Sequence, residues 1–253
     1  MLNKLIKYEF KATSRIFLPL YLGVLIVATL NKIAIEVKGG FQEAFTDSFI
    51  MTLATVLIYF AIIISLLVIT FAIIVERFRK NILCDEGYLM NTIPVKPWEN
   101  ISSKLIVAVM WNLFSVIIGA ISVLILDYRM IADIFNTIMD QFGNSYFIMV
   151  GVSSLIGAIT TTLMIYLSLA VGNIFSQNKI LAAIGTFIVL NTISNILSFA
   201  LMVANINIFD TTQMETVNLS LNMQLPALIL SAVMAIAYFI LTNYILSKKL
   251  DLQ

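Results

Sequence analysis

The charged residues of this chain leave six long stretches without any charge, which cover residues 16–31, 48–75, 105–126, 141–178, 180–209 and 216–247. A helix that crosses the hydrocarbon core of a bilayer needs about 20 predominantly apolar residues. We therefore predict six transmembrane helices, at about residues 16–35, 49–75, 104–126, 146–171, 180–204 and 225–246. The first stretch is short, but Arg15 and Lys32 at its ends can extend to the lipid headgroups.

The overall composition agrees with this pattern. Of the 253 residues, 60% are hydrophobic and 11% are charged, whereas an ordinary soluble domain is about 45–50% apolar and about 25% charged. A soluble chain of this size could not bury so much apolar surface and still present a charged exterior. We therefore predict an all-α membrane protein in which residues 1–253 form a single transmembrane domain.

Lysine and arginine residues are divided unequally between the two sides of the membrane that these helices define. One side carries only Lys32, Lys38 and Arg129. The other side carries Lys4, Lys7, Lys11, Arg15, Arg77, Arg79, Lys80, Lys96, Lys104, Lys179, Lys248 and Lys249. Because short cytoplasmic loops are enriched in Lys and Arg, we predict that both termini are cytoplasmic. The external loops then lie at about residues 36–47, 127–145 and 205–224.

Residues 2–15 form a basic segment in front of the first predicted span. The apolar residues of this segment follow a nearly helical spacing, and its lysines lie elsewhere around the helix. This pattern predicts an amphipathic interface helix that rests on the lipid of the inner leaflet. A plain basic anchor beside the first span explains the same residues equally well.

Several kinds of chemistry are excluded by residues that the chain lacks. It has no histidine and one cysteine, so histidine-based metal, haem and Ser-His sites, and an internal disulfide, cannot form. No Gly-Lys pair occurs, so there is no P-loop for ATP. We predict that the chain is not an enzyme and binds no metal or cofactor. Its net charge of +1 gives no reason to expect nucleic-acid binding.

Polar residues inside the predicted spans allow two interpretations. The residues considered for a substrate path are Asn112, Thr160, Thr161, Asn191 and Asn195. They could line a substrate path between helices. Alternatively, they could form hydrogen bonds between neighbouring helices, and we favour this second interpretation.

The longest cytoplasmic connection, at residues 76–104, contains a short segment with its own helix signals. Asp85 is a suitable N-cap, and Glu86 in the first turn would favour the positive end of a helix. Pro94 limits the length of this element, and Pro97 can open the next helix. The segment therefore predicts a short helix parallel to the membrane that presents two acids and Tyr88 to the cytosol. A solvated loop is the alternative interpretation.

At these residues the chain resembles the ABC-2-type exporter permeases, and most closely those of Gram-positive bacteria. The similar stretch covers residues 77–95, with Asp85, Glu86, Gly87, Tyr88, Leu89 and Met90 followed by Thr92-Ile93-Pro94-Val95. Residues 103–105, 171–180 and 242–250 also fit the family pattern. Where the family often has His-Lys between spans four and five, this chain has Gln177, Asn178 and Lys179. The resemblance extends over six spans, from end to end.

The resemblance implies a type V exporter-like fold and a function. The chain would be the membrane subunit of an ATP-driven exporter in the bacterial cytoplasmic membrane. A second permease subunit, identical or homologous, would complete a dimer, and separate ATPase subunits would bind ATP and Mg. Residues 85–90 would then form the coupling helix, and Gln177, Asn178 and Lys179 a second contact with the ATPase.

The exported substrate would be an antimicrobial peptide, a drug or another amphiphile, often in the context of antibiotic resistance. The alternative from another class is a non-transporting membrane sensor or assembly partner. A cytoplasmic pair of acids and polar helix faces would suit such a protein as well.

Overall fold

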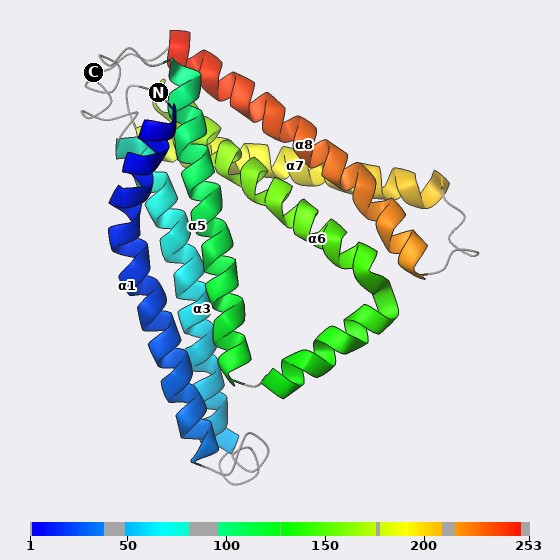
Figure 1. Cartoon of the computed structure of the whole chain (residues 1–253). Helices are drawn as coiled ribbons and strands as arrows, with labels where there is room; N and C mark the ends of the chain where they lie inside the picture. Colours follow the sequence, from blue (N-terminus) through cyan, green and yellow to red (C-terminus); the bar gives the residue numbers. More distant parts are fainter. Residues whose placement is uncertain are drawn as a thin grey trace. The chain divides into compact units, whose positions relative to one another are not determined.

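The computed structural model describes residues 2–37, 49–80, 96–126, 128–175, 178–208 and 216–248, and the elements in this part of the chain are helices. In order they are α1 (Leu2–Glu36), α3 (Phe49–Phe78), α5 (Pro97–Leu126), α6 (Tyr128–Gly172), α7 (Lys179–Ile208) and α8 (Thr216–Lys248) (Figure 1). The predicted all-α fold is therefore confirmed.

Each of the six helices contains a candidate membrane span. The spans are Leu2–Glu36, Leu57–Phe78, Pro97–Leu126, Gly143–Gly172, Lys179–Ala204 and Gln224–Ser247. They match the six predicted spans in number and order. Since helices satisfy their own backbone hydrogen bonds, they are the natural way for such apolar segments to cross lipid. The chain has the architecture of a multi-pass membrane protein.

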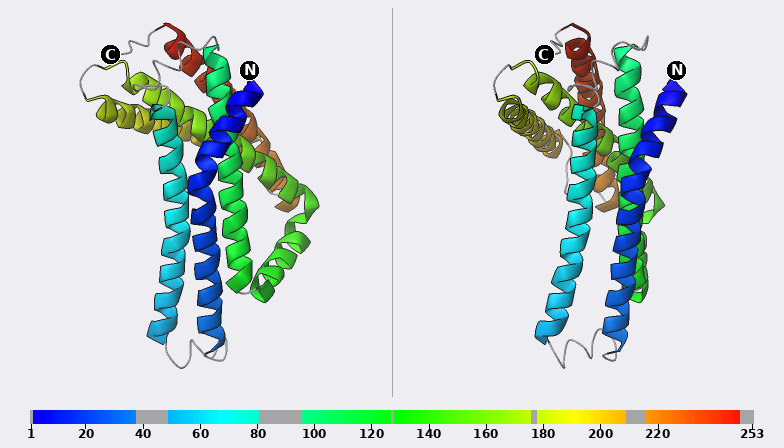
Figure 2. Two further views of the ribbon diagram at one scale, coloured as in Figure 1. Left: turned by 60° about the vertical axis from the view of Figure 1, so that its left-hand side comes forward. Right: turned by 90° about the vertical axis from the view of Figure 1, so that its left-hand side faces the viewer.

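Helix α1 joins the predicted interface helix 2–15 and the first predicted span into one continuous element. Pro19 lies inside this helix. A proline ring removes one backbone hydrogen bond and displaces the preceding turn, which is the commonest cause of a sharp bend. Figure 2 shows that the axis of α1 changes direction within its N-terminal half. The placement of residues 2–15 on the inner leaflet stays a prediction.

The chain divides into two compact units. Unit 1 comprises Met1–Ile6, Ile74–Val109 and Ile138–Gln253, and unit 2 comprises Lys7–Ile73 and Met110–Thr137. Long helices run from one unit into the other, since the division falls inside α1, α3, α5 and α6.

Unit 2 is held together by hydroxyl contacts between its three long helices. The Tyr21 hydroxyl of α1 lies 2.9 Å from Ser115 Oγ of α5, and Thr70 of α3 lies 3.0 Å from the same oxygen. Further along, the Tyr59 hydroxyl of α3 lies 2.7 Å from Ser122 Oγ of α5. Because residue numbers fall along α3 as they rise along α5, these two helices are antiparallel.

Trp111 of α5 forms an aromatic cluster with α1 in the same unit. Its ring stacks on Phe17 at 4.4 Å and on Phe10 at 4.9 Å between centroids. The indole Nε1 donates a hydrogen bond of 2.7 Å to Thr13 Oγ1, so the one polar atom of this buried side chain is satisfied. Trp111 contacts Thr13 and Phe17 of α1, and one turn further along α5 Ser115 contacts Tyr21. Residue numbers therefore rise together along α1 and α5, so these two helices are parallel.

Unit 1 has a hydrophobic core built on a second aromatic stack. Phe78 near the C-terminal end of α3 stacks on Tyr166 of α6, with 3.9 Å between ring centroids. Two helices predicted to end on the same side of the membrane therefore meet near their C-terminal ends. The other buried members of this core are Ile74, Ile101, Ala108, Leu163, Met164, Leu167, Ala170, Ala235, Tyr238 and Ile245.

Helix α6 breaks at Gly143, where the backbone has φ 71° and ψ 174°. Residues 128–142 before this break are helical, so the predicted external connection over residues 127–145 contains a helix where the sequence analysis expects a loop. The reason is visible in the sequence, because apolar residues recur every three or four positions from Tyr128 to Phe142. That spacing is typical of an amphipathic helix rather than a loop. The helical structure likewise covers residues 205–208 and 216–224 of the third predicted external loop.

The hydroxyl of Ser115 is expected to stabilise unit 2, because it satisfies both Tyr21 and Thr70. We predict that Ser115→Ala lowers the free energy of unfolding by about 1 kcal/mol, the order found for hydrogen bonds between membrane helices. Thermal unfolding in detergent, followed by the fluorescence of Trp111 in a Trp98→Phe background, measures this loss. Ser65→Ala is the matched control, because exposed Ser65 bonds only the Ile62 carbonyl of its own helix. Equal melting temperatures for the two variants would contradict the prediction.

Candidate functional site

The predicted ATPase contacts fall partly within the described chain. Asp85, Glu86, Gly87, Tyr88, Leu89 and Met90 lie outside the described residues, and so does Gln177. Asn178 and Lys179 are described, and they form the start of α7. The second predicted contact can therefore be built from its residues upward.

The turn between α6 and α7 has a defined backbone on both sides. The last turn of α6 tightens, since Ile174 N–H donates to the Val171 carbonyl at 3.0 Å and Phe175 N–H donates to the Gly172 carbonyl at 3.3 Å. Asn178 has φ 58°, a left-handed conformation that asparagine tolerates better than most residues. Its carbonyl accepts a 3.0 Å hydrogen bond from Ala182 N–H and so begins α7.

Gly172 allows α6 and α7 to approach closely at this turn. A Cβ atom at this position would lie 2.6 Å from Ala183 Cβ and 2.8 Å from the Lys179 carbonyl oxygen. Only glycine fits such a contact without a shift of the backbone. The ends of α6 and α7 thus meet at a close corner, beside which Phe175, Lys179 and Ile180 are exposed side chains. A cation beside apolar groups suits contact with another protein or with lipid headgroups.

A polar face at the start of α5 was missed by the sequence analysis. Asn100, Ser103 and Lys104 are all buried, and Lys104 is only 4% exposed. Ser103 donates a 2.9 Å hydrogen bond to the Asn100 carbonyl, and the Asn100 side-chain Oδ1 has no hydrogen-bond partner. The helical spacing of these three residues is the signal that could have identified the face.

Two predicted substrate-path residues lie on α6 in unit 1 and differ in their surroundings. Thr160 Oγ1 donates a 3.0 Å hydrogen bond to the Ser231 carbonyl of α8, so it joins two helices. Thr161 is exposed, and its hydroxyl donates to the Gly157 carbonyl of its own helix at 2.9 Å. Thr160 thus forms a hydrogen bond between neighbouring helices, as the second interpretation of the polar residues predicts. Thr161 instead faces outward from the unit.

Asn191 and Asn195 are paired on α7. The Asn195 side-chain amide donates to Asn191 Oδ1 one turn earlier, and Asn195 is exposed. Between them, Ser194 faces α8, where its hydroxyl lies 2.8 Å from the Tyr238 hydroxyl. The amide pair therefore lies beside the contact with α8 rather than in it. No residue from Ile184 to Ala204 of α7 is fully buried.

The predicted path residues are divided between the two units. Asn112 is half-buried on α5 in unit 2, next to Trp111. Thr160, Thr161, Asn191 and Asn195 belong to unit 1.

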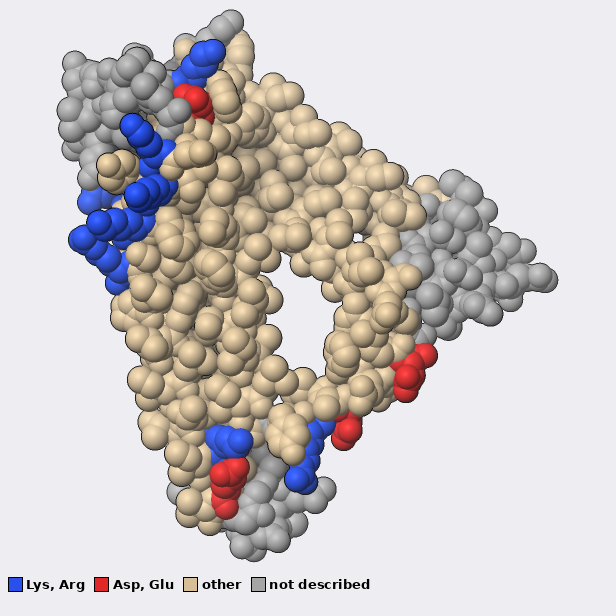
Figure 3. Space-filling model, in the orientation of Figure 1, with Lys and Arg blue, Asp and Glu red and all other residues tan. Residues whose placement is uncertain are grey.

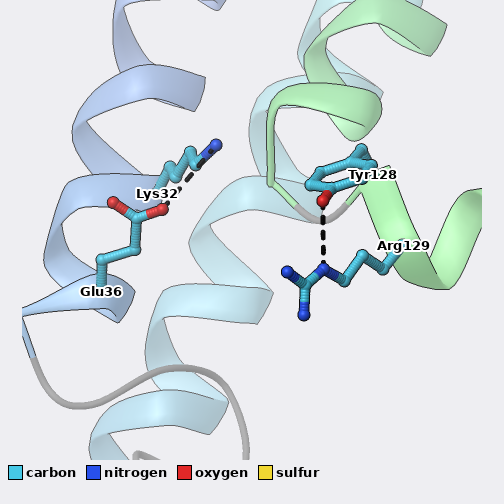
Figure 4. A network of polar contacts seen from close by, with 4 residues as sticks. All are labelled: Lys32, Glu36, Tyr128 and Arg129. Carbon is cyan, nitrogen blue, oxygen red and sulfur yellow. Dashed lines mark hydrogen bonds and ion pairs between the residues drawn. The ribbon is translucent and has the colours of Figure 1, made fainter.

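In the described part of unit 2, charged residues gather toward the two ends of its long helices. Lys7, Lys11 and Arg15 are exposed near the start of α1, and Figure 3 shows the cations gathered there with an uncharged face below them. At the other end Lys32 pairs with Glu36 at 3.7 Å, and Arg129 Nε donates a 3.1 Å hydrogen bond to the Tyr128 hydroxyl (Figure 4). An uncharged band between two charged ends is what a membrane-crossing unit requires.

Among the described residues, no group of three His, Cys, Asp or Glu side chains could hold a metal ion. Comparison with models of protein families, with curated proteins and with solved structures found no match. The function is therefore inferred from the residues of the chain itself.

The close contact at Gly172 gives a direct test of the corner between α6 and α7. We predict that Gly172→Ala destabilises the fold by about 1–3 kcal/mol, because the added Cβ overpacks the contact with Ala183. Combination with Ala183→Gly should restore part of the loss, since it removes the nearest atom. Thermal unfolding followed by circular dichroism measures both effects.

Gly157→Ala is the control for this test, because a Cβ there meets no atom within 4 Å. It should be neutral or stabilising, since alanine favours a helix more than glycine does. If Gly172→Ala were as stable as Gly157→Ala, the corner would not depend on close packing.

Proposed function

We propose that this chain is the permease subunit of an ATP-driven exporter of the ABC-2 type, located in the bacterial cytoplasmic membrane with both termini in the cytoplasm. It would form a dimer with a second permease subunit, and separate ATPase subunits would supply the energy of ATP hydrolysis. The observation that carries the proposal is the polar stripe on α7. We define this stripe as Asn191, Thr192, Asn195 and Ser198.

The stripe lies at the middle of a candidate membrane span. Asn191 and Asn195 are about 18 and 24 Å along the helix from Lys179, at 1.5 Å per residue. Apart from Thr186 and Ser194, the rest of the span after Lys179 is apolar, and Asn195 and Ser198 are exposed in unit 1. Amides are costly to place against hydrocarbon, so polar residues at this depth usually face another helix or a water-filled path. A permease dimer provides both of these surroundings.

The chemistry of the stripe indicates a class of substrate. Its amides and hydroxyls donate and accept hydrogen bonds but carry no charge. Apolar residues such as Ile188 and Ile196 are exposed on the same helix. A molecule with both polar and apolar parts matches this surface better than an ion does, which favours a peptide, a drug or another amphiphile.

Two predicted cytoplasmic segments support the link to an ATPase. The segment Asp85–Met90 resembles the coupling helix of ABC-2 permeases, and the corner at Asn178 and Lys179 would supply a second contact. The glycine contact at Gly172 would keep that corner rigid enough to transmit a push from the ATPase.

Removal of the amides should affect assembly or transport more than folding. We predict that the double variant Asn191→Leu and Asn195→Leu melts at the same temperature as the wild type or higher, because leucine is favourable in lipid. The same variant should lose most of the crosslinking between permease subunits in native membranes, or most of the transport-stimulated ATP hydrolysis. Thr29→Val is the control, because Thr29 is exposed on α1 and its hydroxyl bonds the Ile26 carbonyl of its own helix. Unchanged crosslinking and hydrolysis in the double variant would contradict the proposed role of the stripe.

A second test concerns the coupling segment. Glu86→Arg replaces an attraction to basic groups of the ATPase by repulsion, so it should weaken docking more than Glu86→Gln does. A charge pair at an interface contributes about 1.5 kcal/mol or more, which corresponds to at least a tenfold loss of affinity. Gly87→Leu should obstruct docking sterically. Copurification of the ATPase in detergent measures each effect.

Asp133→Arg is the control for charge reversal, because Asp133 lies on the predicted external side. All of these variants should reach the membrane normally, since none changes a predicted span. If Glu86→Arg and Gly87→Leu both retained the ATPase at the wild-type level, the segment would not be the coupling element. A chain that never copurifies with an ATPase would favour the sensor or assembly partner instead.

A further inference from the structure

The first part of α6, residues 128–142, is an amphipathic helix with two well-separated faces. One face carries Tyr128, Ile131, Ile134, Phe135 and Ile138, which recur every three or four residues. Of these, Tyr128, Ile134 and Phe135 are 59%, 44% and 47% exposed. The other face carries Arg129, Asp133, Asn136, Thr137 and Asp140, all of them exposed. This helix is not part of the permease motif, and the proposed function does not use it.

Both ends of this helix are tied closely to membrane spans. Only Asp127 separates it from α5, which ends at Leu126, and the next candidate span begins at Gly143. Two consecutive spans are joined on one side of the membrane, so both ends of the helix must lie near the same membrane surface. The helix itself is about 22 Å long, at 1.5 Å per residue.

An upright orientation is incompatible with these connections. A rigid helix that pointed away from the membrane would carry one of its ends about 22 Å from the surface. The following span could then begin only after a return segment of comparable length. The chain has no such segment, because the next candidate span begins at Gly143, directly after the helix. The helix must therefore run along the membrane surface.

The break at Gly143 allows the chain to turn from the surface into the next span. Its φ of 71° and ψ of 174° lie in a region that is open essentially to glycine alone. A Cβ atom there would meet no atom within 4 Å, so the backbone conformation rather than crowding requires glycine.

The helix begins at the end of unit 2 where charged residues follow the uncharged band. Tyr128 and Arg129 form a hydrogen-bonded pair, with the guanidinium 5.7 Å from the ring centroid. Figure 4 shows this pair at the same end of unit 2 as the ion pair of Lys32 and Glu36, where α1 ends. A tyrosine beside an arginine is typical of the headgroup region, because such side chains have an apolar body and a polar tip.

We propose that residues 128–142 form a membrane-surface helix whose apolar face is inserted among the lipids of the leaflet opposite the basic segments, on the predicted external side. Lipid is the occupant of this face because the face is continuous with two membrane spans and parallel to the surface between them. The helix bears Arg129, Asp133 and Asp140, a net charge of −1. Its attachment therefore depends on apolar burial and not on attraction to anionic lipid.

Site-directed spin labelling of the full chain in lipid vesicles tests this orientation. The only cysteine is first removed as Cys84→Ser, and single cysteines are then introduced at Ile131, Ile134, Asp133, Asn136 and Asp140. Collisions of each label with oxygen, which concentrates in lipid, are compared with collisions with a water-soluble nickel complex. Ile117→Cys is the reference for deep lipid, because Ile117 is 51% exposed within the α5 span.

Labels at Ile131 and Ile134 should collide several-fold more with oxygen than with nickel, and labels at Asp133, Asn136 and Asp140 should show the reverse. This pattern should be the same in phosphatidylcholine vesicles with and without anionic phosphatidylglycerol. Equal access of nickel to both faces would overturn the proposal and show a helix in water. An apolar face that neither reagent reaches would overturn it in favour of a protein partner, and dependence on phosphatidylglycerol would refute apolar burial as the cause.

Discussion

The fold depends on the requirement that every polar group placed in lipid finds its partner within the protein. For the backbone, a helix meets this requirement within one segment, and helices are the elements of the described chain. Hydroxyl side chains meet it in the same local way. Thr70, Thr162, Ser168 and Thr242 are buried, and each donates to the carbonyl four residues before it on its own helix. These residues can therefore occupy spans without a partner helix.

Contacts between helices follow a recurring pattern in both units. Lipid is as apolar as a leucine side chain, so hydrophobicity alone does not bring membrane helices together. In unit 2, Tyr21 meets Ser115 and Tyr59 meets Ser122, and in unit 1, Tyr238 meets Ser194. Each pair buries an aromatic ring and satisfies two hydroxyls at once. The tyrosine–serine pairs thus provide both the packing area and the specificity of the contact.

The sequence was sufficient to predict the spans, because the absence of charge over long stretches is a direct consequence of the lipid environment. Residues 128–142 lie in a predicted external loop because Arg129, Asp133 and Asp140 interrupt the uncharged stretches, but the structure there is an amphipathic helix. The period of its apolar residues was the better guide. Within the candidate site, the polar residues of the spans were identified, but their partners were not. Whether Thr160 reaches Ser231 or faces outward depends on the rotation of two helices distant in sequence, which no local pattern contains.

The same physical requirement distinguishes the asparagine pair of α7 from the hydroxyl side chains of the spans. Thr160 and Ser194 are satisfied by α8, and hydroxyls such as Thr192 are satisfied by their own helix. An asparagine amide is longer than a hydroxyl and has two donors and two acceptor sites. The bond from Asn195 to Asn191 uses one donor and one acceptor of the pair. In a bilayer the remaining capacity favours a second polar surface, and within a permease dimer that surface would be the partner subunit or the hydrated substrate. The amide pair therefore costs the single chain stability in lipid. In the proposed permease dimer the same amides would bind the partner subunit or the substrate.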